Sequence, residues 1–256
     1  VSSLTQRGKY ITLQALEAGA LDFVPKPATD MARGLKEMMI ELRTKIKIAS
    51  KANVSHWKNK KIDNIQKAAF QATKVFAESN NKVIVIGAST GGTEALRKVI
   101  STLPPTMPGI LVVQHMPSGF TKTFADRLNE LSLMQVKEAQ TGDRIMNGRV
   151  LIAPGDYHIK VIRSGGYYQV LCYDGEKVNG HRPSVDILMF SVAEHFADNA
   201  FGIILTGMGN DGAAGLKAMK DAGAVTLGQD EQSSVVYGMP KVAFDIGAVD
   251  KQYSID

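Results

Sequence analysis

The strongest structural signal in this sequence is Val83-Ile84-Val85-Ile86-Gly87-Ala88-Ser89-Thr90-Gly91-Gly92. Four apolar, β-branched residues end in a run of glycine and hydroxyl residues, which predicts a buried strand followed by a tight turn. Apolar residues then recur with helical spacing, at Ala95, Leu96, Val99, Ile100 and Leu103. Ser89 would therefore project from a sharp bend at a helix N-terminus, where free backbone amides can face an anion or a developing oxyanion.

Three interpretations of this turn are open. The spacing Gly87-x-Ser89-x-Gly91 fits the nucleophile elbow of serine hydrolases. The spacing Gly87-x-Ser89-x-x-Gly92 is a degraded nucleotide-binding loop, with serine where a glycine would let a pyrophosphate approach. The third interpretation is a strand-to-helix turn in which the serine serves only as a cap. The rest of the chain has to decide between them.

Residues 82–256 alternate buried strands with helices, which predicts a mostly parallel, doubly wound α/β sheet of Rossmann-like type. A β-hairpin with its turn at Ser164-Gly165-Gly166 interrupts the alternation. The further predicted strands are Gly109–Pro117, Val150–Gly155, Ala200–Thr206 and Ala224–Gly228, and the further helices are Thr121–Leu131, 184–197 (with Ser184 as its cap) and Ala213–Ala222.

Three predicted strands each end in one chemically reactive side chain: Ser89, His115 and Asp211. Because parallel strands bring their carboxyl ends to one edge of a sheet, the three side chains should meet there. Together they have the composition of a Ser-His-Asp site, in which the histidine takes the serine proton and the aspartate fixes the imidazole. Each has a structural explanation when taken alone, such as a turn and helix cap at Asn210-Asp211-Gly212.

Composition narrows the class of protein. The chain has 256 residues, 44% of them hydrophobic, and carries no apolar run long enough to span a membrane. Its net charge of +5 is concentrated in residues 28–82, with twelve Lys/Arg against five Asp/Glu. That segment lacks the interleaved aromatic residues of a base-stacking surface, so nucleic acid is not expected as a partner.

The single cysteine, Cys172, excludes an intrachain disulfide and fits a reducing compartment, for which the bacterial cytoplasm is the simplest choice. Its strand context, Val170-Leu171-Cys172-Tyr173, predicts a buried structural thiol rather than a nucleophile. No cysteine cluster or paired histidine spacing is present, so neither a metal site nor a cofactor is predicted.

The first residues resemble the C-terminal part of a response-regulator receiver domain, through Ala18-Gly19-Ala20-x-Asp22-Phe23-x-x-Lys26-Pro27. Around this signature we expect a helix ending at Gly19, a strand at Leu21–Val24 and a further helix over residues 30–50. The resemblance implies that Ser2 and Lys26 neighbour a phosphoryl group on an upstream aspartate. We expect that aspartate to lie before residue 1.

This predicts three parts of the chain. Residues 1–50 form the C-terminal part of a flavodoxin-like receiver, residues 51–81 form a basic interdomain linker with Trp57 as a contact, and residues 82–256 form the catalytic domain.

Four motifs carry a closer resemblance: Gly87-Ala88-Ser89-Thr90-Gly91-Gly92, Gln114-His115-Met116-Pro117, His181-Arg182-Pro183-Ser184-Val185-Asp186 and Leu205-Thr206-Gly207-Met208-Gly209-Asn210-Asp211-Gly212. They look like the chemotaxis response regulator protein-glutamate methylesterase family (CheB-type). The resemblance implies that Ser89, His115 and Asp211 are catalytic. It also implies oxyanion stabilisation around Thr90 and the backbone amide of Met208, while His181 and Arg182 are candidates for substrate binding.

The implied activity is hydrolysis of glutamate methyl esters, and deamidation of glutamines, on bacterial chemoreceptors. The receptors would be the substrate, and the pathway's histidine kinase a partner of the full-length protein; no membrane insertion is expected. The chain order Ser, His, Asp differs from that of ordinary α/β-hydrolases. Two alternatives remain: a nucleotide-binding domain using Gly87–Gly92, which lacks the acidic residue expected about 20 positions on, and a catalytically silent receptor-docking module.

Overall fold

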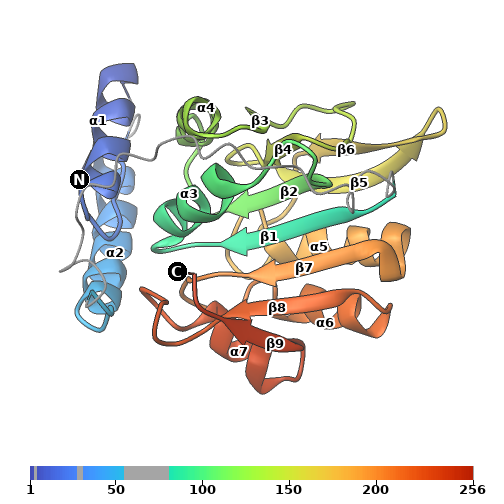
Figure 1. Cartoon of the computed structure of the whole chain (residues 1–256). Coiled ribbons are helices and arrows are strands. Elements are labelled where there is room, and N and C mark those ends of the chain that lie inside the picture. The colour runs from blue at the N-terminus through green and yellow to red at the C-terminus, as the bar shows by residue number, and fades with distance from the viewer. Residues whose placement is uncertain (3–4, 28–30, 55–80, 256) are drawn as a thin grey trace.

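A computed structural model describes residues 1–2, 5–27, 31–54 and 81–255 of the chain. Its centre is a parallel seven-stranded sheet with the strand order β3-β4-β2-β1-β7-β8-β9 (Figure 1). The seven strands are β1 (Val83–Ala88), β2 (Gly109–Gln114), β3 (Gln135–Glu138), β4 (Arg149–Ile152), β7 (Ala200–Ile204), β8 (Val225–Gln229) and β9 (Lys251–Tyr253). The predicted mostly parallel α/β sheet is confirmed.

The helices are α1 (Gln6–Glu17), α2 (Met31–Ala49), α3 (Gly92–Thr102), α4 (Phe120–Leu131), α5 (Val185–Phe196), α6 (Ala213–Asp221), α7 (Met239–Asp245) and the 3-10 turn η3 (Ala197–Asn199). Helices α3 and α4 cover one face of the sheet and α5, α6 and α7 cover the other, whereas α1 and α2 lie beside the edge formed by the carboxyl ends of the strands (Figure 1). A two-stranded antiparallel hairpin, β5 (His158–Ser164) and β6 (Tyr167–Tyr173), lies beside the sheet, as predicted.

Strand β1 shows why the sheet needs two covered faces. All six of its residues are buried. Successive side chains of a strand point to opposite faces, so Val83 and Val85 join the core formed with α5, α6 and α7, whereas Ile84 and Ile86 join the core formed with α3 and α4. This double burial explains why β1 is a continuous apolar run rather than an alternating one.

Four elements differ from the sequence-based expectation. Leu21–Val24 forms no strand. Among the described residues, the β-pairing in this region is a single isolated bridge between Ser2 and Pro25. Strand β3 was not predicted, since Val136 is its one fully buried residue and its pattern is weak. The short elements α7 and β9 were not predicted either, because seven and three residues give too little periodicity.

Helix α2 confirms the helix expected over residues 30–50. Most of the predicted linker, including Trp57, lies outside the described residues. None of the described helices has the length and apolarity needed to cross a lipid bilayer.

Candidate active site

The carboxyl ends of neighbouring strands bring the three predicted catalytic residues to one edge of the sheet. Ser89 follows β1 and His115 follows β2, and the paired residues Ala88 and Gln114 set the two ends side by side. Asp211 lies in the loop between β7 and α6, and β7 pairs with β1 on the other side. Ser89 and His115 line one cavity on this edge, together with Thr90, His181 and Met208.

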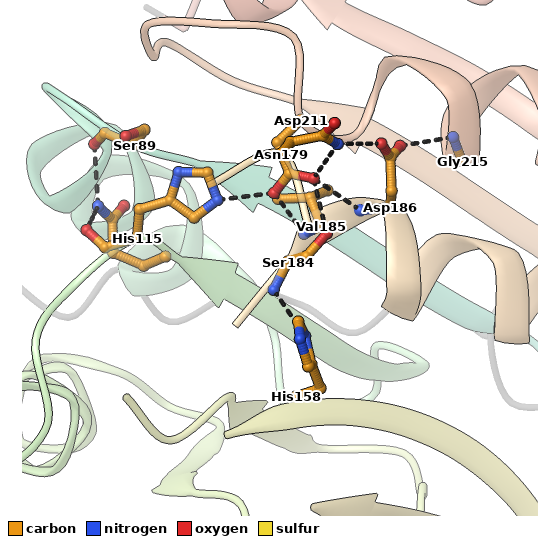
Figure 2. Close-up of polar contacts among 10 residues, drawn as sticks. Ser89, His115, His158, Asn179, Ser184, Val185, Asp186, Asp211 and Gly215 are labelled. Carbon is orange, nitrogen blue, oxygen red and sulfur yellow. Dashed lines mark hydrogen bonds and ion pairs between the residues drawn. The ribbon is translucent and has the colours of Figure 1, made fainter. Parts of the chain in front are cut away.

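Two of the candidate catalytic residues, His115 and Asp211, are in direct contact. The ring Nε2 of His115 lies 2.8 Å from Oδ2 of Asp211, and Asp211 is 1% exposed. The other ring nitrogen, Nδ1, is buried and has no hydrogen-bond partner among the described residues. Figure 2 shows Nδ1 on the side of the ring that faces Ser89. The nitrogen available to accept a proton is therefore Nδ1.

Asp211 is held as a carboxylate by several donors (Figure 2). Its Oδ1 accepts hydrogen bonds from the Ser184 hydroxyl at 2.7 Å and the Asn179 amide at 3.0 Å, and its Oδ2 accepts one from the Val185 amide at 2.7 Å. Burial on its own raises the pKa of Asp211. The hydrogen bond and charge of His115, with the bonds from Ser184 and Asn179, outweigh burial and hold this pKa well below the ordinary value.

Ser184 shows a difference from the sequence-based expectation. It occupies the N-cap position of α5, but its side chain makes no capping hydrogen bond and instead donates to Asp211. The carboxylate of Asp211 replaces the missing cap, because it accepts from the first amides of α5, Val185 at 2.7 Å and Asp186 at 3.3 Å. The positive end of the helix dipole thus also stabilises the ionised carboxylate.

Asn179 and Asp186 complete this network and were not predicted as site residues. The Asn179 amide nitrogen donates to Oδ2 of Asp186 at 2.7 Å as well as to Asp211, so it bridges two buried carboxylates. Asp186 also accepts from the Gly215 amide at 2.7 Å, and burial raises its pKa. Asn179 has a φ of 53°, which asparagine tolerates better than most residues. Its polar loop gave no periodic signal that could have identified it.

The structure brings the predicted residue His181 directly onto His115. The two rings are stacked, with centroids 3.7 Å apart and planes inclined by 7°. Burial, followed by the charge of His115, lowers the pKa of His181 from 6.5 to about 4. Its neighbour Arg182 lines the same cavity, but its guanidinium is hydrogen-bonded to Asp174 and to the carbonyl of Gly175.

We expect His181 to make the stability of the protein depend on pH. In the unfolded chain a histidine titrates near 6.5, so between pH 4 and 6.5 the unfolded state binds more protons than the folded state. The folded state therefore loses stability as the pH falls through this window, by about 1 to 3 kcal/mol after allowance for the partly exposed ring. His181→Phe keeps an aromatic ring that cannot be protonated, and should remove this loss. Chemical denaturation at pH 7 and pH 4.5 measures it; the same pH dependence in both proteins would contradict the assignment.

Two residues that line the cavity, Thr90 and Met208, have backbone amides for which the described part of the chain shows no hydrogen-bond partner. The loop that carries Met208 runs against the nucleophile candidate, since a Cβ added at Gly207 would lie 2.7 Å from Cβ of Ser89. The hydroxyl of Thr90 already donates to Asp22 at 3.0 Å. The backbone amide of Thr90 is therefore the donor of this residue that could bind an oxyanion. The arrangement can present two N–H donors near Ser89.

Residues of the N-terminal segment border this cavity. Asp22 accepts from Lys45 at 2.9 Å, and both residues line the cavity with Ser89. Ser2 and Lys26 are also brought together, since the Lys26 amide donates to the Ser2 carbonyl at 2.7 Å. The Lys26 side chain is exposed.

Other candidate chemistries have weak support. Cys172 lies half-buried in β6, and burial raises the pKa of its thiol to about 11, so it is a poor nucleophile. Among the described residues, no group of three or more His, Cys, Asp or Glu side chains could hold a metal ion.

Comparisons with known proteins identify the family of this chain. Residues 84–256 match the family model of the CheB methylesterase. The whole chain is 60% identical to a protein-glutamate methylesterase/protein-glutamine glutaminase of Syntrophotalea carbinolica, and covers 72% of its length. A protein of the same name from Sulfurimonas denitrificans is 53% identical over 98% of the chain, which again covers 72% of that protein.

A solved structure gives the same result. The crystal structure of the Thermotoga maritima CheB methylesterase catalytic domain matches with a TM-score of 0.67 and 39% sequence identity. The match covers 69% of this chain and 94% of that domain. With a family model matching most of the chain and relatives at 50–60% identity over nearly all of it, this chain belongs to the CheB methylesterase family.

Proposed function

We propose that this protein is a serine hydrolase that demethylates glutamate methyl esters, and deamidates glutamines, on bacterial chemoreceptors. The observation that carries the proposal is the hydrogen-bonded pair of His115 and Asp211, whose free Nδ1 lies on the side of Ser89. The names of the relatives at 50–60% identity support both activities.

In the first half of the reaction, Nδ1 of His115 takes the proton of the Ser89 hydroxyl as Oγ forms a bond to the ester carbonyl carbon. Asp211 accepts from Nε2–H, and so keeps the imidazole in the tautomer whose Nδ1 is free and stabilises the imidazolium. The amides of Thr90 and Met208 donate to the developing oxyanion. The tetrahedral intermediate collapses, the carbon–OCH3 bond breaks, and His115 returns the proton to the leaving methanol.

In the second half, water attacks the acyl group on Ser89 and gives up a proton to His115. The bond to Oγ then breaks, Ser89 regains its proton, and a glutamate side chain is released. Deamidation follows the same course with ammonia as the leaving group. No cofactor or metal ion is needed for any of these steps.

We assign substrate contacts to His181 and Arg182, because both line the cavity beside Ser89. Methyl-accepting chemoreceptors are the proposed partner, and the cytoplasm the proposed compartment, in agreement with the single cysteine. For residues 1–50 we retain the receiver assignment, with Ser2 and Lys26 as neighbours of a phosphoryl group and a chemotaxis histidine kinase as its donor.

The test is methanol release from membranes that contain methylated chemoreceptors. The protein should release methanol in proportion to its concentration, and unmethylated receptor membranes should give none. Ammonia release from receptors that carry glutamine at the same positions tests the second activity. No methanol from fully methylated membranes, with the protein shown to be folded, would contradict the proposal.

A further inference from the structure

We propose that Gln114 is a positioning residue for ester hydrolysis, because its side-chain amide fixes the peptide that carries the Thr90 oxyanion donor relative to the backbone of His115. This inference rests on the proposed function. Gln114 does not line the cavity that contains Ser89, so it would act through its neighbours and not by contact with the substrate.

Gln114 is the last residue of β2 and is 3% exposed. Its Nε2 donates to the carbonyl of Ser89 at 2.9 Å and to the carbonyl of His115 at 3.2 Å. Both partners can only accept, so they fix the nitrogen end of the amide on this side. One side chain thus bonds to the backbone of both the proposed nucleophile and the proposed base.

The bond to Ser89 also orients the next amide. The Ser89 carbonyl accepts from Nε2 of Gln114 and from the Gly92 amide, at 2.9 and 2.8 Å. In a trans peptide the C=O and the following N–H point in opposite directions. Because Gln114 Nε2 and the Gly92 amide hold the Ser89 carbonyl, the Thr90 N–H points away from these two donors. The Thr90 amide is one of the two amides at the cavity for which the described residues show no partner. Without Gln114 the Gly92 amide alone would hold this peptide.

The other end of the Gln114 side chain packs closely against Gly92. Its Oε1 is buried and has no hydrogen-bond partner among the described residues, which costs stability. This oxygen occupies the space that a Cβ at position 92 would need, so a residue larger than glycine at 92 would displace the amide. The glycine at the start of α3 and the glutamine at the end of β2 are therefore one packing unit.

The test is Gln114→Met, which keeps the length of the side chain and removes its donor. We expect kcat for methanol release to fall by about 10- to 100-fold, because the oxyanion donor and the base lose their fixed geometry. KM for methylated receptor membranes should change by less than threefold. A peptide boronic acid, which forms a tetrahedral adduct with Ser89, should bind more weakly by the same factor as kcat, whereas a peptide carrying the glutamate product should bind as before.

Ser191→Ala is the control. Ser191 is 8% exposed and lies away from the cavity, and its hydroxyl accepts from the Val161 amide at 2.9 Å and donates to the Leu188 carbonyl at 2.7 Å. Its loss should lower the free energy of unfolding by a similar amount and leave the ratio of boronic acid to product affinity unchanged. That ratio separates an effect on the reacting geometry from a loss of stability alone.

The possible outcomes separate this inference from the proposed function. If the parent protein releases methanol and Gln114→Met keeps kcat within threefold, or loses boronic acid and product binding equally, the positioning role is wrong and the function stands. If the parent releases no methanol, the proposed function fails instead. Should Gln114→Met not fold, Gln114→Leu removes the same donor with another apolar side chain, and the same selective loss is expected.

Discussion

Ser89→Ala is expected to lower kcat for methanol release by about 10⁴- to 10⁶-fold, the largest effect of any single substitution in this protein. The Ser89 hydroxyl makes no hydrogen bond with another described residue. Its backbone is held independently, since its amide donates to the Thr206 carbonyl at 3.0 Å. The variant should therefore fold with unchanged stability and lack only the atom that forms the acyl bond.

Initial rates of methanol release and the thermal unfolding midpoint measure both parts of this expectation. Ser101→Ala is the matched control, because Ser101 lies on α3, is 8% exposed, and also has a hydroxyl with no hydrogen-bond partner in the described part of the chain. It should leave the rate and the stability essentially unchanged. If Ser89→Ala retained more than a tenth of the parent rate, Ser89 would not be the nucleophile.

The strands that carry the site could be predicted because both faces of each are covered. The runs at β1 and β2 are buried throughout, so their apolar residues are continuous and end abruptly at Ser89 and His115. Parallel pairing then fixes that both residues reach the same edge. Elements with one or two buried residues, such as β3, carry no comparable signal.

The surroundings of Ser89, His115 and Asp211 depend on contacts that periodicity does not encode. Asn179 reaches Asp211 and Asp186 through a loop with positive φ, and the hydroxyl of Ser184 bonds to Asp211, 27 positions away, instead of capping its own helix. The choice of Nε2 rather than Nδ1 of His115 as the partner of Asp211 also arises only when three strand ends are assembled. The roles proposed for Ser89, His115 and Asp211 are predictions that the substitutions described here test.

Asp211→Asn is expected to lower kcat by about 10⁴-fold, the size of the effect in the general Ser-His-Asp template. Oδ2 of Asp211 holds the Nε2–H of His115 and accepts from the Val185 amide, while Oδ1 accepts from Ser184 and Asn179. An asparagine NH2 in the Oδ2 position would point a donor at Nε2. The ring proton would then move to Nδ1, and Nδ1 could not accept the proton of Ser89.

The alternative orientation of that asparagine is no better, because an NH2 in the Oδ1 position would face the donor group of Asn179. Asp250→Asn is the control: Asp250 accepts from the Thr226 amide at 2.9 Å and pairs with Lys220 at 3.0 Å, remote from the cavity. Both variants should lose stability, but only Asp211→Asn should lose kcat. Because Asp211 makes more hydrogen bonds than Asp250, rates are compared only after circular dichroism has shown that each variant is folded. If folded Asp211→Asn kept kcat within tenfold of the parent, the carboxylate would serve the packing of α5 rather than the tautomer of His115.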